Sequence, residues 1–234
     1  MKAKFIQFAV SAAFLIGSLV VLIAAASSDA IDGPLSVFAA IWATGFVATL
    51  IHEIAHAWIA LKRGAEINTI AVIPFSYLPL KRKFAFMRYV PSGDIGGYVN
   101  YTFPGDFGTR RDEIAIAAAG PAANFLTAAL LLLAINVWPA DAPAERSSAM
   151  SPIVAIEEGQ PPMSDRPAQF LPSQEKIDAI VRETKDRACA RDRHELFTAL
   201  INLLIVVSIV SGVLNLLPYK GSDGAIILEH LRWR

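Results

Sequence analysis

The stretch ATLIHEIAHAWIALKRG, residues 48–64, places two histidines and a glutamate inside an otherwise apolar run. His52 and His56 are four residues apart, so a helix would set both imidazole rings on one face, with Glu53 beside them. Two such histidines can hold one metal ion, and the adjacent glutamate can act as general base for an attacking water. Two buried histidines that only hydrogen-bond to their neighbours would be an equally good explanation in a soluble helix. Within a membrane span, ionisable residues are costly and indicate function by default, which favours the metal site.

The whole chain has the composition of a small membrane protein. Of its 234 residues, 54% are hydrophobic and only 18% are charged, against about 25% charged in a typical soluble domain. The apolar residues gather in four runs that reach the length of about 20 residues needed to cross a bilayer. The predicted fold class is therefore an all-α polytopic membrane protein with about four transmembrane helices. The runs cover roughly residues 5–26, 37–61, 114–138 and 196–217.

Charge and cysteine content exclude several classes of function. The net charge is zero and the isoelectric point is about 6.9, so we expect no nucleic-acid partner. The single cysteine, Cys189, excludes an intrachain disulfide and a metal site built from cysteines.

The first apolar run is compatible with two interpretations. Lys2 and Lys4 precede it and small residues follow it, as in a signal peptide. Its apolar core of about 22 residues exceeds the 7–15 residues of a typical signal-peptide core. We therefore expect residues 1–26 to form a first transmembrane helix, and a cleaved signal peptide is the less favoured alternative.

The distribution of basic residues predicts the orientation in the membrane. Two lysines near the N-terminus place that end in the cytoplasm. Residues 62–112 carry eight Lys/Arg, whereas the loop 27–36 carries none, so the former segment is also expected to be cytoplasmic. Four spans return the C-terminus to the cytoplasm, as in a multi-pass protein of the cell (inner) membrane. Residues 139–195 argue against this orientation with eight Lys/Arg, although eleven Asp/Glu accompany them.

The cytoplasmic segment 63–112 has features of β-structure. Residues 67–75, 83–90 and 96–103 are rich in β-branched and aromatic side chains, and Pro, Gly, Ser and Asp separate them. They predict two or three short strands in a small membrane-associated β-hairpin region. The alternative is an amphipathic patch that lies on the membrane surface.

The segment 139–195 is expected to be extracytoplasmic. It begins with Pro, Ala, Ser and Glu in no regular period, which predicts a mobile loop. From about residue 173 to 195, helix formers follow a serine, so we expect a polar helix that leads into the last span.

A catalytic zinc site needs a third protein ligand and leaves its fourth position to water. His194 lies on the opposite side of the membrane in the predicted topology, and His230 lies in a polar tail. Asp223 is the better candidate, because proline and glycines in NLLPYKGSDG (215–224) interrupt the apolar run just before it. A non-helical loop at membrane depth is tolerated where it lines protein or a wet cavity. The alternative is a simple turn with a solvated carboxylate.

Asn124 is a candidate for a second polar role. At a rise of 1.5 Å per residue it lies roughly 16 Å from Glu113, and His52 lies about 15 Å from Lys62, counted from the same side. The amide is therefore expected near the depth of the histidines, where it can donate to a peptide carbonyl or an oxyanion. The surrounding AAAGPAANF (117–125) contains small residues that let helices approach closely. Its Gly-Pro pair can equally mark a kink.

Together these motifs resemble those of the site-2 protease family of intramembrane zinc metalloproteases. HEIAH (52–56) is similar to the zinc-binding helix of that family, and GPAANF (120–125) to its Gly-Pro-x-x-Asn segment. NLLPYKGSDG (215–224) is similar to the motif that ends in the third ligand. GGYV (96–99) is similar to a membrane-associated β-loop in the bacterial branch that cleaves anti-sigma factors.

The resemblance implies a role for each matching residue. His52, His56 and Asp223 would hold one Zn²⁺ ion, and Glu53 would be the catalytic base. Asn124 would help to hold the substrate. The β-loop would add further substrate contacts, through Gly96, Gly97, Tyr98 and Val99.

The chain departs from the family pattern in two places. PDZ domains often separate the last two spans of the bacterial branch, whereas residues 139–195 provide only 57 positions here. We therefore expect residues 1–234 to form a single membrane-embedded protease domain. YKGS before Asp223 is also more polar than the usual apolar filling.

The expected function is cleavage of a transmembrane segment in a single-span membrane protein, within the lipid bilayer. One alternative is a non-proteolytic relative that binds zinc and serves as a scaffold. A metal transporter is less favoured, because the first and last spans offer few polar residues for a path across the bilayer.

Overall fold

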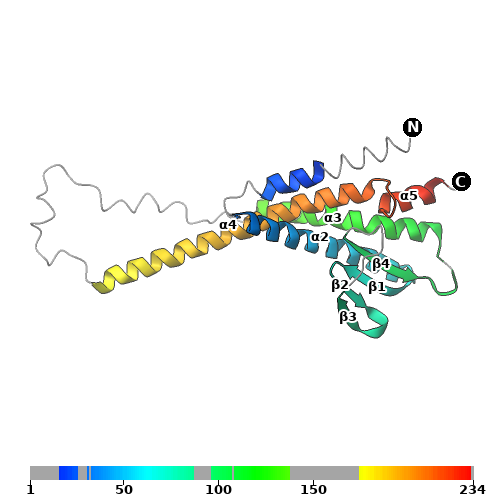
Figure 1. Cartoon of the computed structure of the whole chain (residues 1–234), viewed down its shortest axis with the longest axis horizontal. Coiled ribbons are helices and arrows are strands. Elements are labelled where there is room, and N and C mark those ends of the chain that lie inside the picture. The colour runs from blue at the N-terminus through cyan, green and yellow to red at the C-terminus, as the bar shows by residue number, and fades with distance from the viewer. Residues whose placement is uncertain are drawn as a thin grey trace, which may run out of the picture. The chain divides into compact units, whose positions relative to one another are not determined.

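The computed structural model of this chain is mostly helical with one small antiparallel sheet (Figure 1). It describes residues 16–25, 31, 33–86, 96–106, 108–137 and 174–232. The chain divides into two compact units: residues 1–135 with 198–234, and residues 136–197.

Within the described residues, three helices are long and apolar enough to cross a membrane, which confirms the predicted fold class. They are α2 (Pro34–Lys62), α3 (Arg110–Val137) and the part Ile177–Leu216 of α4 (Gln174–Leu216). A shorter apolar helix, Ile16–Ala25, falls within the first predicted span. Residues 1–15, the rest of that prediction, lie outside the described part of the chain.

Helix α2 has two contrasting faces. Its exposed face carries large apolar side chains, among them Phe38, Trp42 and Trp58, which are 52–66% exposed. Its buried face repeats every fourth residue and is made of small or polar side chains, which allow close helix packing in a membrane. The residues in this repeat are Ala40, Thr44, Ala48, His52, His56 and Ala60, and Glu53 and Ala57 beside them are also buried. An apolar outside around a polar inside is the arrangement expected of a helix that contacts lipid.

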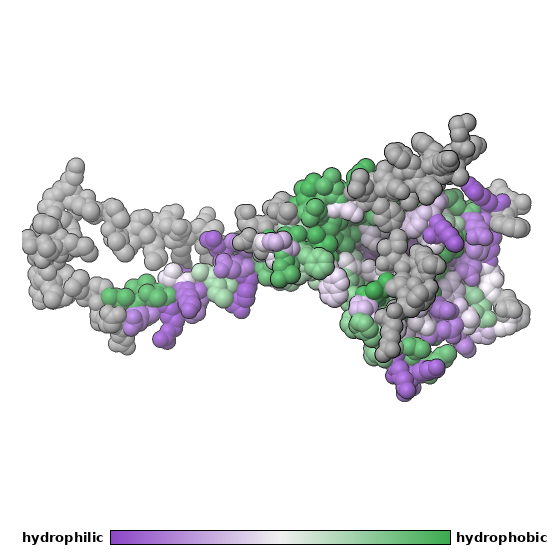
Figure 2. All heavy atoms as spheres, in the orientation of Figure 1, coloured by the Kyte–Doolittle hydropathy of each residue, from purple (hydrophilic) through white to green (hydrophobic). Residues whose placement is uncertain are grey.

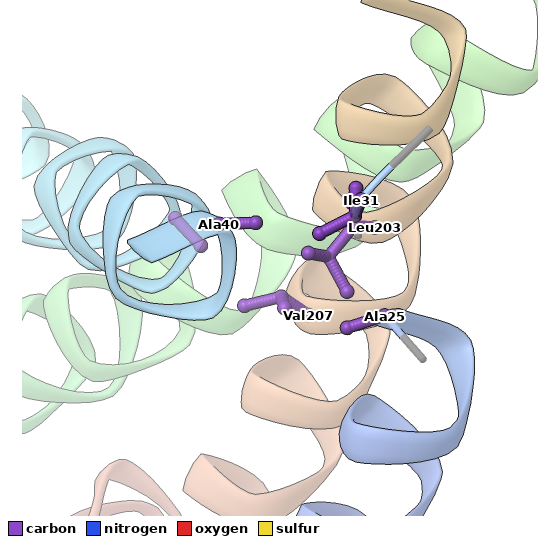
Figure 3. Packing of buried hydrophobic residues seen from close by; sticks show 6 residues of the cluster. Ala25, Ile31, Ala40, Leu203 and Val207 are labelled. Atoms are coloured by element: carbon purple, nitrogen blue, oxygen red, sulfur yellow. The ribbon is translucent and has the colours of Figure 1, made fainter. Parts of the chain in front are cut away.

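The first unit has a packed apolar cluster between α2 and α4. Ala40 of α2 meets Leu203 and Val207 of α4, and Ala25 and Ile31 complete the group (Figure 3). In Figure 2, hydrophobic side chains gather over the helices of this unit, whereas hydrophilic and hydrophobic ones are mixed around its sheet. The cluster fixes α2 beside α4, which matters because both helices contribute to the site.

The sheet contains four strands in the order β3-β2-β1-β4. Two or three strands were expected, and the number is wrong because residues 67–75 break at the Ile73–Pro74 turn into β1 and the start of β2. The last predicted strand corresponds to β4, whereas residues 87–90 of the middle one lie outside the described part. The strands are β1 (Glu66–Val72), β2 (Phe75–Leu78), β3 (Lys83–Phe86) and β4 (Gly97–Thr102).

The sheet packs against the end of α2 through β1 and β4. Ala57 and Ala60 of α2, Ile67 of β1 and Ile116 of α3 form a second buried cluster, which Val99 of β4 covers. Among the residues that the structure describes, all the strand pairs are antiparallel and β4 is an edge strand. The edge of the sheet is thereby held next to the histidine helix.

The polar helix expected before the last span is confirmed as the first part of α4, which continues into the span without a break. Charged pairs one turn apart support its exposed part, as they do in isolated helices. Arg187 pairs with Glu183, and Arg191 pairs with Glu195. The loop expected at the start of 139–195 lies outside the described residues.

Candidate metal centre

Helix α2 presents three ionisable side chains on its buried face. His52, Glu53 and His56 are 5%, 5% and 7% exposed. The helical spacing brings the two imidazoles together edge to face, with an angle of 79° between their planes. Their Nε2 atoms lie 3.0 Å apart. Two ring nitrogens therefore converge on one point inside the protein.

The carboxylate of Asp223 completes the convergence from the first turn of α5 (Asp223–Arg232). Its Oδ2 lies 3.0 Å from Nε2 of His52, and its Oδ1 lies 3.3 Å from Nε2 of His56. The Asp223 side chain is only 12% exposed, so the alternative of a solvated turn does not describe it. Within the described residues these three form a group whose ligand atoms all lie within 4.8 Å of one another.

The loop between α4 and α5 explains how the carboxylate is aimed. Gly221 has a φ of +88°, a left-handed conformation that turns the chain back toward α4. Ser222 caps α5, because its Oγ accepts from the amide of Ala225 at 3.1 Å. A Cβ on Gly224 would lie 2.1 Å from the carbonyl oxygen of Leu216. Only glycine permits this close approach of α5 to the end of α4.

Helix α3 supports the histidines from the other side. Nδ1 of His56 lies 2.6 Å from the carbonyl oxygen of Ile116 and donates to it, which leaves Nε2 with its lone pair. The amide nitrogen of Asn124 lies 3.2 Å from Nδ1 of His52. A Cβ on Gly120 would lie 2.3 Å and 2.5 Å from the two Nε2 atoms, so the space between the rings exists because residue 120 has no side chain.

The donor set fits a zinc ion. Two imidazole nitrogens and one carboxylate are the ligand types of catalytic zinc sites, at bond lengths of about 2.0–2.2 Å. Tetrahedral ligands at that distance are about 3.3 Å apart, and the three closest separations here are 3.0, 3.0 and 3.3 Å. Electron-pair donors this close to one another are most simply satisfied by a shared cation.

A cavity of about 450 Å³ opens onto the three donor residues and Glu53. The wall opposite α2 is formed by Gly96, Gly97, Tyr98 and Val99. A Cβ on Gly97 would lie 2.6 Å from the carbonyl oxygen of Ala71 and 2.9 Å from Oε1 of Glu53. Strand β4 therefore passes directly over the glutamate, and the absence of a side chain at residue 97 allows it.

A hydrogen bond between β4 and α3 secures this wall. The Tyr101 hydroxyl donates to Oε2 of Glu113 at 2.5 Å. Burial and this bond to Glu113 raise the pKa of Tyr101 well above its ordinary value, so the phenol remains a donor throughout the neutral range. The wall of the cavity is thus tied to the helix that supports the histidines.

The structure brings together most of the side chains that the sequence singled out. Asn124 also lies beside His52, but it is completely buried and is not among the described residues that line the cavity. His194 is exposed, and His230 bonds to the carbonyl of Ile226 in its own helix.

Asn215 is a polar residue of the site that the sequence analysis did not select. Its amide nitrogen lies 3.4 Å from Nε2 of His52, and the residue lines the cavity. The Tyr219 hydroxyl lies 3.4 Å from its Oδ1. An amide at the end of an apolar run was the available signal, because polar groups in a span indicate function.

Comparisons with known proteins give one result. The family model described as peptidase family M50 matches residues 38–234, which include every residue of the donor group and the β4 wall. Comparisons with curated proteins and with solved structures found no significant match.

Proposed function

Because the chain belongs to peptidase family M50, the site-2 protease family of membrane metalloproteases, we propose that it is a zinc-dependent endopeptidase that cleaves transmembrane segments. The observation that carries this proposal is the convergence of His52, His56 and Asp223 next to the buried Glu53. Those three residues would hold one zinc ion. When bound, zinc supplies a Lewis acid that polarises the scissile carbonyl and makes water more acidic.

Glu53 is the general base of the proposed reaction. It neighbours His52 in the sequence and opens onto the same cavity, so its carboxylate can take a proton from the attacking water. The proton is then passed to the amine that leaves. Helices α2, α3 and α4 surround this chemistry with apolar side chains, which limits the access of bulk water.

The proposed substrate is a single-span membrane protein. A helix keeps its peptide carbonyls in internal hydrogen bonds, so the segment must unwind before a carbonyl can reach the site. Edge strand β4 lies at the wall of the cavity, and an unwound segment can pair with it as an added strand. Gly96, Gly97, Tyr98 and Val99 then contact the substrate mainly through their backbone.

The proposed orientation follows the basic residues of the sequence. With both termini in the cytoplasm of a cell (inner) membrane protein, the sheet lies on the cytoplasmic side and the donor group in the inner half of the bilayer. Cleavage would release the cytoplasmic fragment of the substrate.

The function is tested with the purified full-length protein in detergent. Synthetic single-span peptides are incubated with the protein, with the protein plus a chelator, and with the chelated protein after zinc is restored. The expected result is a product that the chelator removes and zinc brings back. Zinc-loaded protein that cuts no peptide of a broad panel would contradict the proposal and favour a scaffold. Zinc flux into liposomes would favour a transporter.

A further inference from the structure

Asn124 has an unusual position for a residue that contacts substrate. It is completely buried in α3, and its amide nitrogen lies 3.2 Å from Nδ1 of His52 and 3.2 Å from Oγ of Ser211. Its amide oxygen has no hydrogen-bond partner among the residues that the structure describes. The cavity lies on the opposite side of the ring, where Nε2 of His52 faces Asp223.

We infer that Asn124 is a positioning residue, which fixes the ring of His52 and the nitrogen that it offers to the metal. The inference deepens the proposed function and rests on it. It replaces the substrate contact that the sequence resemblance implies for Asn124.

The protons of His52 provide the physical reason. A neutral imidazole that offers the lone pair of Nε2 to a metal carries its proton on Nδ1. That N–H needs an acceptor, because an unpaired buried donor costs about 1–3 kcal/mol. An amide group keeps its shape when its oxygen and nitrogen exchange places. With the oxygen toward His52, Asn124 accepts from Nδ1 and also from the hydroxyl of Ser211. Its NH2 group then occupies the position where the oxygen has no partner among the described residues.

His56 shows the same arrangement with a different acceptor. Its Nδ1 donates to the carbonyl of Ile116 at 2.6 Å. Ile116 and Asn124 are eight residues apart on α3, so they lie on one face of that helix, two turns from each other. Helix α3 thus supplies an oxygen acceptor for the Nδ1–H group of each histidine. Gly120, between Ile116 and Asn124, leaves room for the two rings.

Residues that orient metal ligands have a measurable signature. Loss of such a partner typically lowers metal affinity about 10–100-fold. A residue that only contacts substrate would instead raise KM and leave metal affinity unchanged. The two roles therefore predict different outcomes for the same substitution.

The test compares Asn124→Leu with Asn124→Asp in the purified full-length protein. Leucine keeps the branching of the side chain at Cγ but is larger and has no acceptor, whereas aspartate keeps the size of asparagine and is an acceptor only. Zinc retention is measured against graded chelator, and the cobalt-substituted protein is examined by visible absorption. We expect the leucine variant to lose about 10–100-fold in zinc affinity with an altered cobalt spectrum, and the aspartate variant to stay within about tenfold of wild type.

A pair of serines on α4 provides a milder version of the same test. Ser211→Ala removes the second group that contacts the amide of Asn124 and should lower zinc affinity by a few-fold. Ser208→Ala is the control on the same helix, because the Oγ of Ser208 has no partner among the described residues. Ser208 is fully buried, whereas Ser211 is half-buried. The control should bind zinc as the wild type does.

Several results would overturn the inference. One is a leucine variant that binds zinc normally but has a raised KM. Another is an aspartate variant that folds but loses zinc as the leucine variant does. If the leucine variant does not fold, equal zinc affinity in the two serine variants would refute the inference. Wild-type protein that binds no zinc would instead refute the proposed function itself.

Discussion

Gly120 of α3 lies directly against the imidazole of His56, and a Cβ at residue 120 would be 2.3 Å from its Nε2. Such a contact is far inside van der Waals distance, so Gly120→Ala must move the helix or tilt both histidine rings. We expect this variant to lose most of its zinc, as measured by elemental analysis after dialysis. Gly45→Ala on α2 is the matched control, because a Cβ there meets nothing within 4 Å. Full zinc content in Gly120→Ala would contradict the site geometry.

Glu53→Gln separates metal binding from proton transfer. Glutamine keeps the shape of the side chain but cannot take a proton, and general bases contribute about 10²–10⁴ to a rate. We expect zinc content equal to that of the wild type and cleavage reduced at least about a hundredfold. Cleavage is followed by mass spectrometry of the peptide products. Unchanged cleavage in a preparation free of other proteases would remove Glu53 from the proposed role.

Ser222→Ala tests how the loop aims Asp223. The substitution removes the cap of α5, a loss that usually costs about 1 kcal/mol. If the cap stabilises the metal-binding position of the Asp223 carboxylate by this amount, its loss lowers zinc affinity about fivefold. Chelator competition measures the change, and Ser36→Ala, at an exposed hydroxyl near the start of α2, serves as the control.

Gly97→Ala tests the passage of β4 over Glu53. The added methyl would meet the carbonyl oxygen of Ala71 and the carboxylate of Glu53, so the strand must lift from the helix. We expect cleavage to fall at least about tenfold while zinc remains bound, because the three donors are not displaced. Gly96→Ala is the matched comparison, since its methyl meets Thr49 at an ordinary 3.4 Å. Equal losses in both variants would contradict this account.

Helical periodicity predicted the histidine part of the site well. A spacing of four residues determines that His52 and His56 share a face, and the surrounding helix is long and apolar. The rise per residue likewise placed Asn124 near His52, which the structure brings within 3.2 Å. Properties that depend on one regular element can be read from the chain directly.

Features that depend on contacts between separate helices, strands and loops could not be predicted from helical periodicity. The helix-breaking proline and glycines made Asp223 the better candidate for a third ligand, and the family resemblance supported it. No local pattern, however, shows that Gly221 and Gly224 fold the loop back onto α4. Gly120 was expected to let helices approach closely or to mark a kink, and the structure shows that it leaves room for two histidine side chains of another helix. The sheet gained an unexpected strand because the turn at Ile73–Pro74 divides a continuous β-rich stretch.

The proposed ligands come from widely separated parts of the chain: Asp223 follows His52 by 171 residues (223 − 52). At about 5–20 residues per second, roughly 10–30 s of translation pass between them. The nascent chain therefore inserts helix α2, with His52 and His56, well before Asp223 has been synthesised. Under the proposed function, the chain would become competent for hydrolysis only after its last proposed ligand, Asp223, has been synthesised and folded into place.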